Sequence, residues 1–339
     1  MAAPVEVTTS VGKTTPGQPT GTVRIAALRD DALVEDVPLG ELGELVRARD
    51  ARVWIDLSNP SAEEMAAVAQ ELGIHPLIVE DITESNERAK VEHVGDVIHL
   101  VLFALARDGE IRADELDFVL GRGFLVSVHP GSWDPRSAHQ LRAGLEPALK
   151  RGPDFLLWAL VDAVVDGYFP IFDRLADEID ELQDRVLERP DPETLQRVFG
   201  MKRELIKIRH VVAPSREIFN QLTSREYELI AESQVLYFRD IYDHLIRLTD
   251  DFDSFRELVS ATVEVYLSTI NNNLSSIMKR LTGVTVVLAG IGAVGGLFGM
   301  SQATPALAGH EGFGFWAITI GSFAVAGMVV AVLHRIDWI

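Results

Sequence analysis

The residues whose spacing most suggests chemistry form a stripe close to the C-terminus. From Met278 onward, small or weakly polar residues recur at alternating intervals of four and three, which places them on one face of a helix. The stripe consists of Met278, Thr282, Thr285, Ala289, Gly292, Gly296 and Gly299. Small residues allow helices to pack closely in a membrane, and their backbone and hydroxyl oxygens can also line a narrow path that faces water. The spacing alone favours close packing and leaves the path as the alternative.

A glycine motif in the same region is excluded as a nucleotide site. Residues 290–295 match the dinucleotide fingerprint G-x-G-x-x-G. That motif requires a preceding strand and a helix that opens at the glycines, within a soluble βαβ unit. Residues 281–310 contain no Asp, Glu, Lys or Arg, so we expect a membrane helix here instead.

Two apolar segments must position the stripe. The first covers about residues 281–300 and the second about 313–333, and neither contains a charged side chain. Twenty helical residues are about 30 Å long, which matches the hydrocarbon core of a bilayer. We therefore expect a transmembrane domain over 281–339 with two membrane helices, against the alternative of two buried core helices.

The basic residues around these segments predict the orientation. Lys279 and Arg280 precede the first segment, His334 and Arg335 follow the second, and the loop 301–312 has no Lys or Arg. Because cytoplasmic flanks carry the excess of positive residues, we expect both termini in the cytoplasm. The sequence thus predicts a multi-pass protein of the cell membrane, either the inner or the plasma membrane.

The composition of the remaining chain excludes several functions. The net charge is −20, and of the charged residues only Glu311, Arg335 and Asp337 follow position 280. A basic face for nucleic acid is therefore not expected. An acidic body concentrates cations near its surface, although the charge alone favours solubility as its explanation. There is no cysteine, and no coherent pair of nucleophile and base is present, so we expect no enzyme.

The segment before the membrane is predicted in three parts. Residues 1–20 are rich in Ala, Pro, Thr and Gly and lack an apolar core segment, so they are expected to be a disordered tail. A cytoplasmic α/β domain follows over 21–152, with a mixed or antiparallel sheet. Ser61 and Glu64 supply a capping box for a helix that ends near Leu72. The expected strands are 22–28, 53–57, 97–105, 116–120 and 124–128.

After the α/β domain we expect a helical stalk domain over 153–280, which consists of long helices instead of strands alternating with short helices. We expect Pro170 to kink the first of these helices and Pro190 to end it. Asp191, which is followed by a proline, is expected to start the next helix, and Pro214 is expected to bend that helix. From Leu236 to Met300 no proline interrupts the pattern. An unbroken helix of about 65 residues would be about 100 Å long.

A series of short motifs runs through nearly the whole chain after the tail. They are 54–57 (WIDL), 73–77 (GIHPL), 80–82 (EDI), 160–163 (LVDA) with Asp166 and 168–169 (YF), 237–244 (YFRDIYDH), 264–268 (EVYLS), 278–282 (MKRLT), 299–300 (GM) and 338–339 (WI). With these motifs the chain resembles the CorA family of divalent-cation transporters. Taken together the motifs are specific, because they occur in the family's order and at family-like separations.

The resemblance implies a funnel-shaped homopentamer in which the first membrane helix lines the pore. The pore mouth of the family reads Gly-Met-Asn, whereas this chain has Gly299, Met300 and Ser301. A serine ring is shorter than an asparagine ring and offers one hydroxyl per chain. The other positions that map to the pore are Ser275, Met278, Leu281, Thr282, Thr285, Ala289, Gly292 and Gly296. Met278 and Leu281 would form an apolar constriction that gates by dewetting.

The resemblance also implies regulatory cations between neighbouring cytoplasmic domains. The residues that align with this role are Asp81 and Asp240, with Glu80, Asp162 and His244 nearby. Carboxylates of two subunits repel each other until a cation bridges them, so cytosolic Mg²⁺ would hold the pentamer closed. Glu264 would attract cations toward the axis.

The resemblance thus predicts a transporter of divalent metal cations that is gated by cytosolic cation. Mg²⁺ is the favoured ion, both transported and regulatory, with Co²⁺ or Ni²⁺ as further substrates. One alternative is a Zn²⁺ transporter of the same superfamily, with His310 and Glu311 in the outer loop as its motivation. Another is a membrane-anchored cation sensor that does not conduct, motivated by Ser301.

Overall fold

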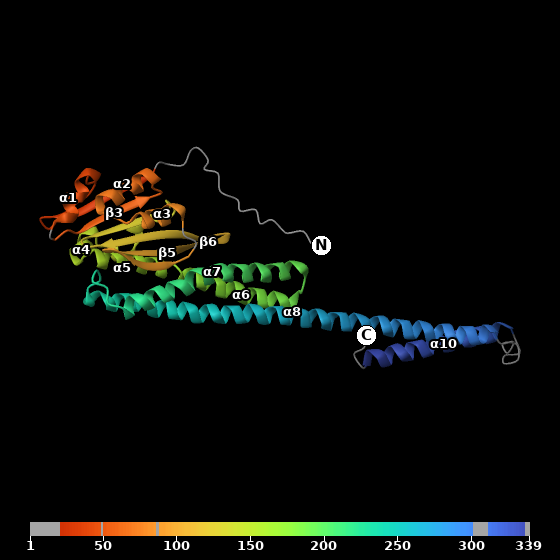
Figure 1. The fold of residues 1–339 in the computed structure, drawn as a ribbon. Helices are drawn as coiled ribbons and strands as arrows, with labels where there is room; N and C mark the ends of the chain where they lie inside the picture. Colours follow the sequence, from red (N-terminus) through yellow and green to blue (C-terminus); the bar gives the residue numbers. More distant parts are fainter. Residues whose placement is uncertain (1–20, 49, 86–87, 301–310, 336–339) are drawn as a thin grey trace, which may run out of the picture. The chain divides into compact units, whose positions relative to one another are not determined.

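The structure is a computed structural model that describes residues 21–48, 50–85, 88–300 and 311–335 (Figure 1). These residues form two compact units. The first contains the described residues up to Ile179 together with Gly200–Glu257, and the second contains Asp180–Phe199 and the described residues from Leu258 onward. The predicted tail 1–20 lies outside the described residues, and the boundaries proposed at 152 and 280 stay predictions.

A seven-stranded mixed sheet forms the centre of the first unit, with the order β2-β1-β3-β7-β6-β5-β4. Strands β3 and β7 pair in parallel, and the other described neighbours pair antiparallel. All five predicted strands are present, and β2 and β4 are additional. The strands are β1 Thr22–Arg29, β2 Ala32–Val34, β3 Val53–Ser58, β4 Lys90–Val94, β5 Val97–Asp108, β6 Glu110–Gly121 and β7 Phe124–His129.

Helices α1 (Leu42–Arg47), α2 (Ala62–Leu72) and α3 (Pro76–Glu84) cover one face of the sheet (Figure 1). The predicted capping box of α2 is confirmed, because Ser61 N donates to Glu64 Oε2 (2.8 Å) and Glu64 N donates to Ser61 Oγ (3.2 Å). Gly73 ends α2 in the left-handed conformation at φ 67°. Met65, Val68 and Ile78 pack with the sheet residues in one buried apolar cluster.

Helices α4 (Leu145–Arg151) and α5 (Pro153–Asp166) cover the opposite face (Figure 1). Helix α5 packs on β5, β6 and β7, and its Leu156, Leu160 and Val161 are completely buried. Burying so much apolar surface on the sheet fixes α5 firmly. The polar residues that α5 carries therefore have defined positions relative to the sheet.

Three longer helices follow, α6 (Phe169–Glu188), α7 (Pro192–Ser224) and α8 (Glu232–Met300). Asp191 starts α7 as predicted, since its Oδ1 accepts a hydrogen bond from Thr194 N (2.7 Å). Pro170 lies in the first turn of α6, where a missing N–H is tolerated, and a turn at residues 167–168 separates α5 from α6 just before it. The kink expected at Pro170 stays a prediction. Within the first unit, Phe219 of α7 stacks on Phe238 of α8 with ring centroids 6.3 Å apart.

The predicted long helix is confirmed as α8, which has 69 residues and continues into the second unit. The second predicted membrane segment lies within α10 (Glu311–Arg335), which carries the apolar stretch Thr319–Val332. By length and composition, two described helical stretches are able to span a membrane, Pro153–Glu188 and Glu232–Ala293. The apolar window of the first is 67% buried, as in a domain core, and that of the second is only 6% buried.

Candidate cation sites and transport path

The first candidate metal site consists of Asp162, Asp240 and His244, and we call it the acidic cluster. One ligand atom from each residue lies within 4.8 Å of those of the others. Asp162 comes from the buried helix α5, whereas Asp240 and His244 are one turn apart on α8. The structure thus brings together three of the predicted regulatory residues within a single chain. A carboxylate pair with an imidazole nitrogen is a ligand set that binds divalent cations.

The environment of Asp162 makes its negative charge unfavourable. Burial is the main cause, the carboxylates of Asp166 and Asp240 add repulsion, and His244 partly opposes it; together they raise the pKa of Asp162 to about 6. Gln140 Nε2 donates a hydrogen bond to Asp162 Oδ2. A bound divalent cation would offset the repulsion among these carboxylates.

His244 has a ring nitrogen available at this site. Its Nδ1 lies 3.9 Å from Asp166 Oδ1, which is beyond hydrogen-bond distance, and no described group bonds to it. The ring of Phe169 packs edge-on against the imidazole at 5.5 Å. The imidazole is therefore held by packing while one nitrogen remains free for a ligand.

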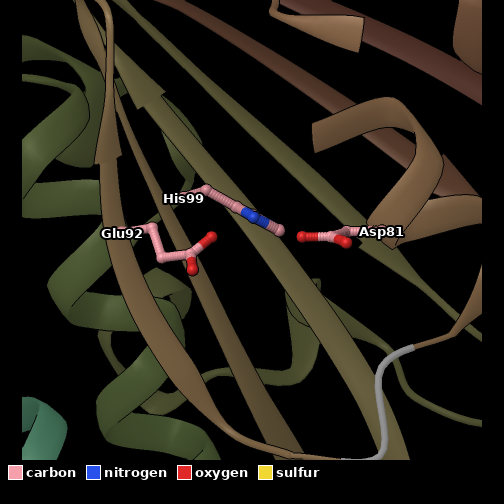
Figure 2. Close-up of side chains that lie close together, drawn as sticks. All are labelled: Asp81, Glu92 and His99. Carbon is pink, nitrogen blue, oxygen red and sulfur yellow. The ribbon is translucent and has the colours of Figure 1, made fainter. Parts of the chain in front are cut away.

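Asp81, the other main residue of the predicted set, belongs to a different cluster. It lies with Glu92 and His99, and one ligand atom from each is within 4.8 Å of the others (Figure 2). Lys90 Nζ forms ion pairs with Asp81 and with Glu92, the latter at 2.9 Å. Glu80 is exposed on α3. The pairing of Asp81 with Asp240 across two subunits stays a prediction.

Sequence reasoning missed Lys90, Glu92 and His99. The signal was present in the strand pattern, because residues two apart on a strand share a face. Glu92 of β4 is directly opposite His99 of β5 in the antiparallel register, so their side chains are neighbours. Strand β4 is short and polar, and without it the register that joins these residues could not be inferred.

The predicted pore residues lie on α8. Ser275, Met278, Leu281, Thr282 and the rest of the mapped positions up to Gly296 are exposed in the single chain. The exposed fractions are 60% for both Met278 and Leu281. Apolar side chains on the other faces of α8 are exposed as well, for example Val284 (50%), so one chain alone does not select the pore-facing side. Gly299 and Met300 end α8, and Ser301 lies outside the described residues.

Thr285 has a hydroxyl geometry that suits contact with hydrated ions. Its Oγ1 donates to the carbonyl oxygen of Leu281, one turn earlier, at 2.8 Å. The hydroxyl hydrogen is thus engaged by the helix itself, and the oxygen lone pairs are left to accept hydrogen bonds. Water molecules around a cation direct their hydrogens outward, so an acceptor is the group that they need. Glu264 is exposed further back on α8.

Comparison with known proteins connects these observations. The family model described as "CorA-like Mg2+ transporter protein" matches residues 50–335. The chain belongs to the CorA family. A relative from Thermotoga maritima named "Cobalt/magnesium transport protein CorA" is 31% identical over 294 residues, which cover 84% of this chain and 83% of the relative.

Solved CorA structures show the same fold. The complete structure of the CorA magnesium transporter from Methanocaldococcus jannaschii superposes with a TM-score of 0.78 at 22% identity, covering 94% of this chain and 99% of that one. The expected architecture is thereby confirmed, with an α/β domain, long helices and candidate membrane helices. The zinc transport protein ZntB of Cronobacter sakazakii is 23% identical over 325 residues, covering 93% of this chain and 92% of the relative.

Membership in the CorA family also establishes the broad functional class of the protein. The family consists of ion transporters of membranes, so this chain is a membrane protein whose cargo is a cation.

Proposed function

We propose that this CorA-family chain carries Mg²⁺ across the cell membrane, passively and along the membrane potential. The observation that carries the proposal is the composition of α8 in a chain of this family. The helix bears Asp240 and His244 of the acidic cluster, and further along it an exposed stripe of small residues and hydroxyls without any charge. A cation bound at the cluster would therefore act on the same helix that lines the proposed path.

The driving force follows from the charge of the ion. Two positive charges that move inward through 100 mV gain about 4.6 kcal/mol, at 2.3 kcal/mol per charge. This energy requires no nucleotide hydrolysis. The acidic body of the protein, with a net charge of −20 for the whole chain, raises the local concentration of cations.

The path would be formed by five copies of α8 in a homopentamer. Thr282 and Thr285 present hydroxyl oxygens as acceptors for the waters of a hydrated ion, and Thr285 is already oriented by its bond to Leu281. Rings of Met278 and Leu281 would form an apolar constriction that empties of water when the helices close. Lipid and the neighbouring copies would cover the exposed apolar faces of α8 and α10.

Regulation would use the carboxylates of the cytoplasmic units. Mg²⁺ binds preferentially to oxygen ligands, and Asp162 and Asp240 supply them within one chain. Asp81 and Asp240 of neighbouring subunits would add a second, bridged position, with Glu80 near it. High cytosolic Mg²⁺ would favour the closed pentamer, and low Mg²⁺ would release it.

The topology that fits this arrangement has two membrane passes. The first lies in the last part of α8 and the second in α10, with both termini in the cytoplasm. Lys279 and Arg280 before the first pass and His334 and Arg335 after the second support this orientation.

Cation flux into vesicles that contain the purified protein tests the function. With an inside-negative potential we expect Mg²⁺ uptake, and with protein-free vesicles none. If no divalent ion enters, the transport proposal fails and the cation-sensor alternative gains. Restoring the family's asparagine with Ser301→Asn is the matched variant: flux that exists only in this variant would support the sensor for the parent chain.

Zn²⁺ transport is the second candidate. It is favoured by the similarity to ZntB and by the imidazole of His244 at the acidic cluster, because imidazole suits Zn²⁺ better than Mg²⁺. Uptake of Mg²⁺ and Zn²⁺ measured in the same vesicle preparation separates the two. Saturable Zn²⁺ uptake that Mg²⁺ does not inhibit would favour the zinc transporter.

A further inference from the structure

A second cluster of metal-ligating residues lies on the face of the sheet that α3 covers. Asp81 of α3, Glu92 of β4 and His99 of β5 each offer a ligand atom within 4.8 Å of the others. Figure 2 shows the ring of His99 directed at the Asp81 carboxylate, with the carboxylate of Glu92 beside the ring. Three different elements thus converge on one point of the first unit.

A hydrogen bond to Asp117 orients the imidazole of His99 as a metal ligand. The residue is completely buried, and its Nε2 lies 2.8 Å from Asp117 Oδ1. In a neutral imidazole one nitrogen donates and the other accepts. Because a carboxylate only accepts, Asp117 places the hydrogen on Nε2 and leaves a lone pair on Nδ1. Metal-binding histidines are oriented in the same manner, with the remote nitrogen donating to a carboxylate.

The other ring nitrogen of His99, Nδ1, is buried and makes no hydrogen bond to any group in the described part of the chain. A buried polar atom without a partner costs about 1–3 kcal/mol. The protein therefore keeps an unpaired nitrogen on a ring that lies beside two carboxylates, an arrangement that packing alone does not require.

Lys90 occupies the place that a cation would take. Its ammonium forms ion pairs with both Asp81 and Glu92, so it neutralises part of the cluster's charge in the metal-free protein. The lysine side chain is 22% exposed and Glu92 is 48% exposed. A flexible lysine stem can swing outward from such a position.

We propose that Asp81, Glu92 and His99 bind a divalent transition metal such as Zn²⁺ or Co²⁺, which displaces the Lys90 ammonium. An imidazole together with carboxylates suits these ions, whereas Mg²⁺ prefers oxygen ligands and keeps its waters. Ligand atoms around a tetrahedral Zn²⁺ lie about 3.3 Å apart. A small inward movement of the exposed Glu92 therefore completes the site, with water as a fourth ligand.

The proposal concerns binding alone, so it stands or falls independently of the transported ion. The metal-free full-length protein in detergent is titrated with Co²⁺ in a large excess of Mg²⁺, and binding is followed by the visible absorption of Co²⁺. Mg²⁺ competes at oxygen-rich sites. A parallel titration of His244→Gln removes the imidazole of the other cluster and is expected to leave this signal in place.

Two substitutions at the surface give opposite expectations. Glu92→Gln removes a ligand and should weaken Co²⁺ binding at least about tenfold, since even partners of ligands contribute 10–100-fold. Lys90→Met removes the competing ammonium and should strengthen binding. The matched controls are Glu63→Gln, an exposed carboxylate on α2, and Lys150→Met, whose ion pair with Glu146 lies on α4. Both controls should bind like the parent.

The result that would overturn the proposal is equally definite. If the parent gives no Co²⁺ signal in excess Mg²⁺, or if Glu92→Gln and Lys90→Met bind like their controls, the cluster is only a buried polar network. Neither substituted side chain is buried, so a failure to fold is not expected to obscure the outcome, and thermal unfolding of each variant checks this.

Discussion

Replacing Asp162 with asparagine tests the electrostatic description of the acidic cluster. Asp162 is nearly buried at 6% exposure, and Asp166 and Asp240 repel its charge. The pKa rises from 3.8 to about 6, a shift that corresponds to at most about 3 kcal/mol of strain at neutral pH. Solvent screening at the exposed Asp240 reduces this value, so we expect about 1–2 kcal/mol.

The expected outcome of Asp162→Asn has two parts. Without divalent cations at pH 7.5, the variant should be more stable than the parent by about 1–2 kcal/mol, or about 2–8 °C in the unfolding midpoint. With Mg²⁺ at a hundredfold excess over its dissociation constant, the parent should gain about 2.7 kcal/mol. The variant should lose most of that gain, because the cation no longer relieves a buried charge.

Thermal unfolding of the detergent-solubilised protein, with chelator and then with Mg²⁺, measures both parts. Asp173→Asn is the matched control, since Asp173 is an exposed aspartate of the same unit and changes the net charge equally. The reasoning is refuted if Asp162→Asn is less stable than the parent in chelator, or if it gains as much stability from Mg²⁺ as the parent and the control do.

Three further predictions concern other parts of the chain. Burial opposes the protonation of His129, but the hydrogen bonds of its ring to Asp56 and to the Pro130 carbonyl outweigh burial and raise the pKa of His129. The stabilisation by the protonated ring is thus complete below pH 6.5 and is lost as the pH rises through the folded-state pKa. The difference in unfolding free energy between the parent and His129→Gln should therefore shrink over that pH range. Thr285→Val keeps the shape but removes the hydroxyl acceptor, and should reduce Mg²⁺ flux in vesicles while leaving unfolding unchanged. Leu281→Ser should hydrate the constriction and raise flux when Mg²⁺ is high on the cytosolic side. Val284→Ser, which is outside the mapped pore positions, should leave this flux unchanged.

The local structure of the first unit could largely be predicted from its sequence. The capping box at Ser61 and Glu64 and the strand that begins at Val53 have short-range signals, namely side-chain caps and β-branched runs. The length of α8 was also predictable, because no proline interrupts it. Strand β4 was missed, since Lys90–Val94 is short and polar at the edge of the sheet, where apolar alternation is weakest.

The candidate sites depend on contacts that sequence patterns do not contain. Asp162 and Asp240 are far apart in the chain, and only the packing of α5 and α8 brings them together. The bond between His99 and Asp117 depends on the register of β5 and β6. The family resemblance supplied the first cluster in advance, whereas the second depends on the register of β4 and β5, which the sequence analysis did not predict. The side of α8 that faces the pore depends on how further copies of the chain pack around it, and this packing could not be predicted from the sequence of one chain.

The most direct test of the account is voltage-driven Mg²⁺ flux through the purified full-length protein in vesicles. The account predicts uptake that grows as the inside potential becomes more negative and that falls when Mg²⁺ is added to the side facing the cytoplasmic units. An absence of flux for Mg²⁺ and every other divalent ion, at any potential and with the cytoplasmic side free of Mg²⁺, would contradict it.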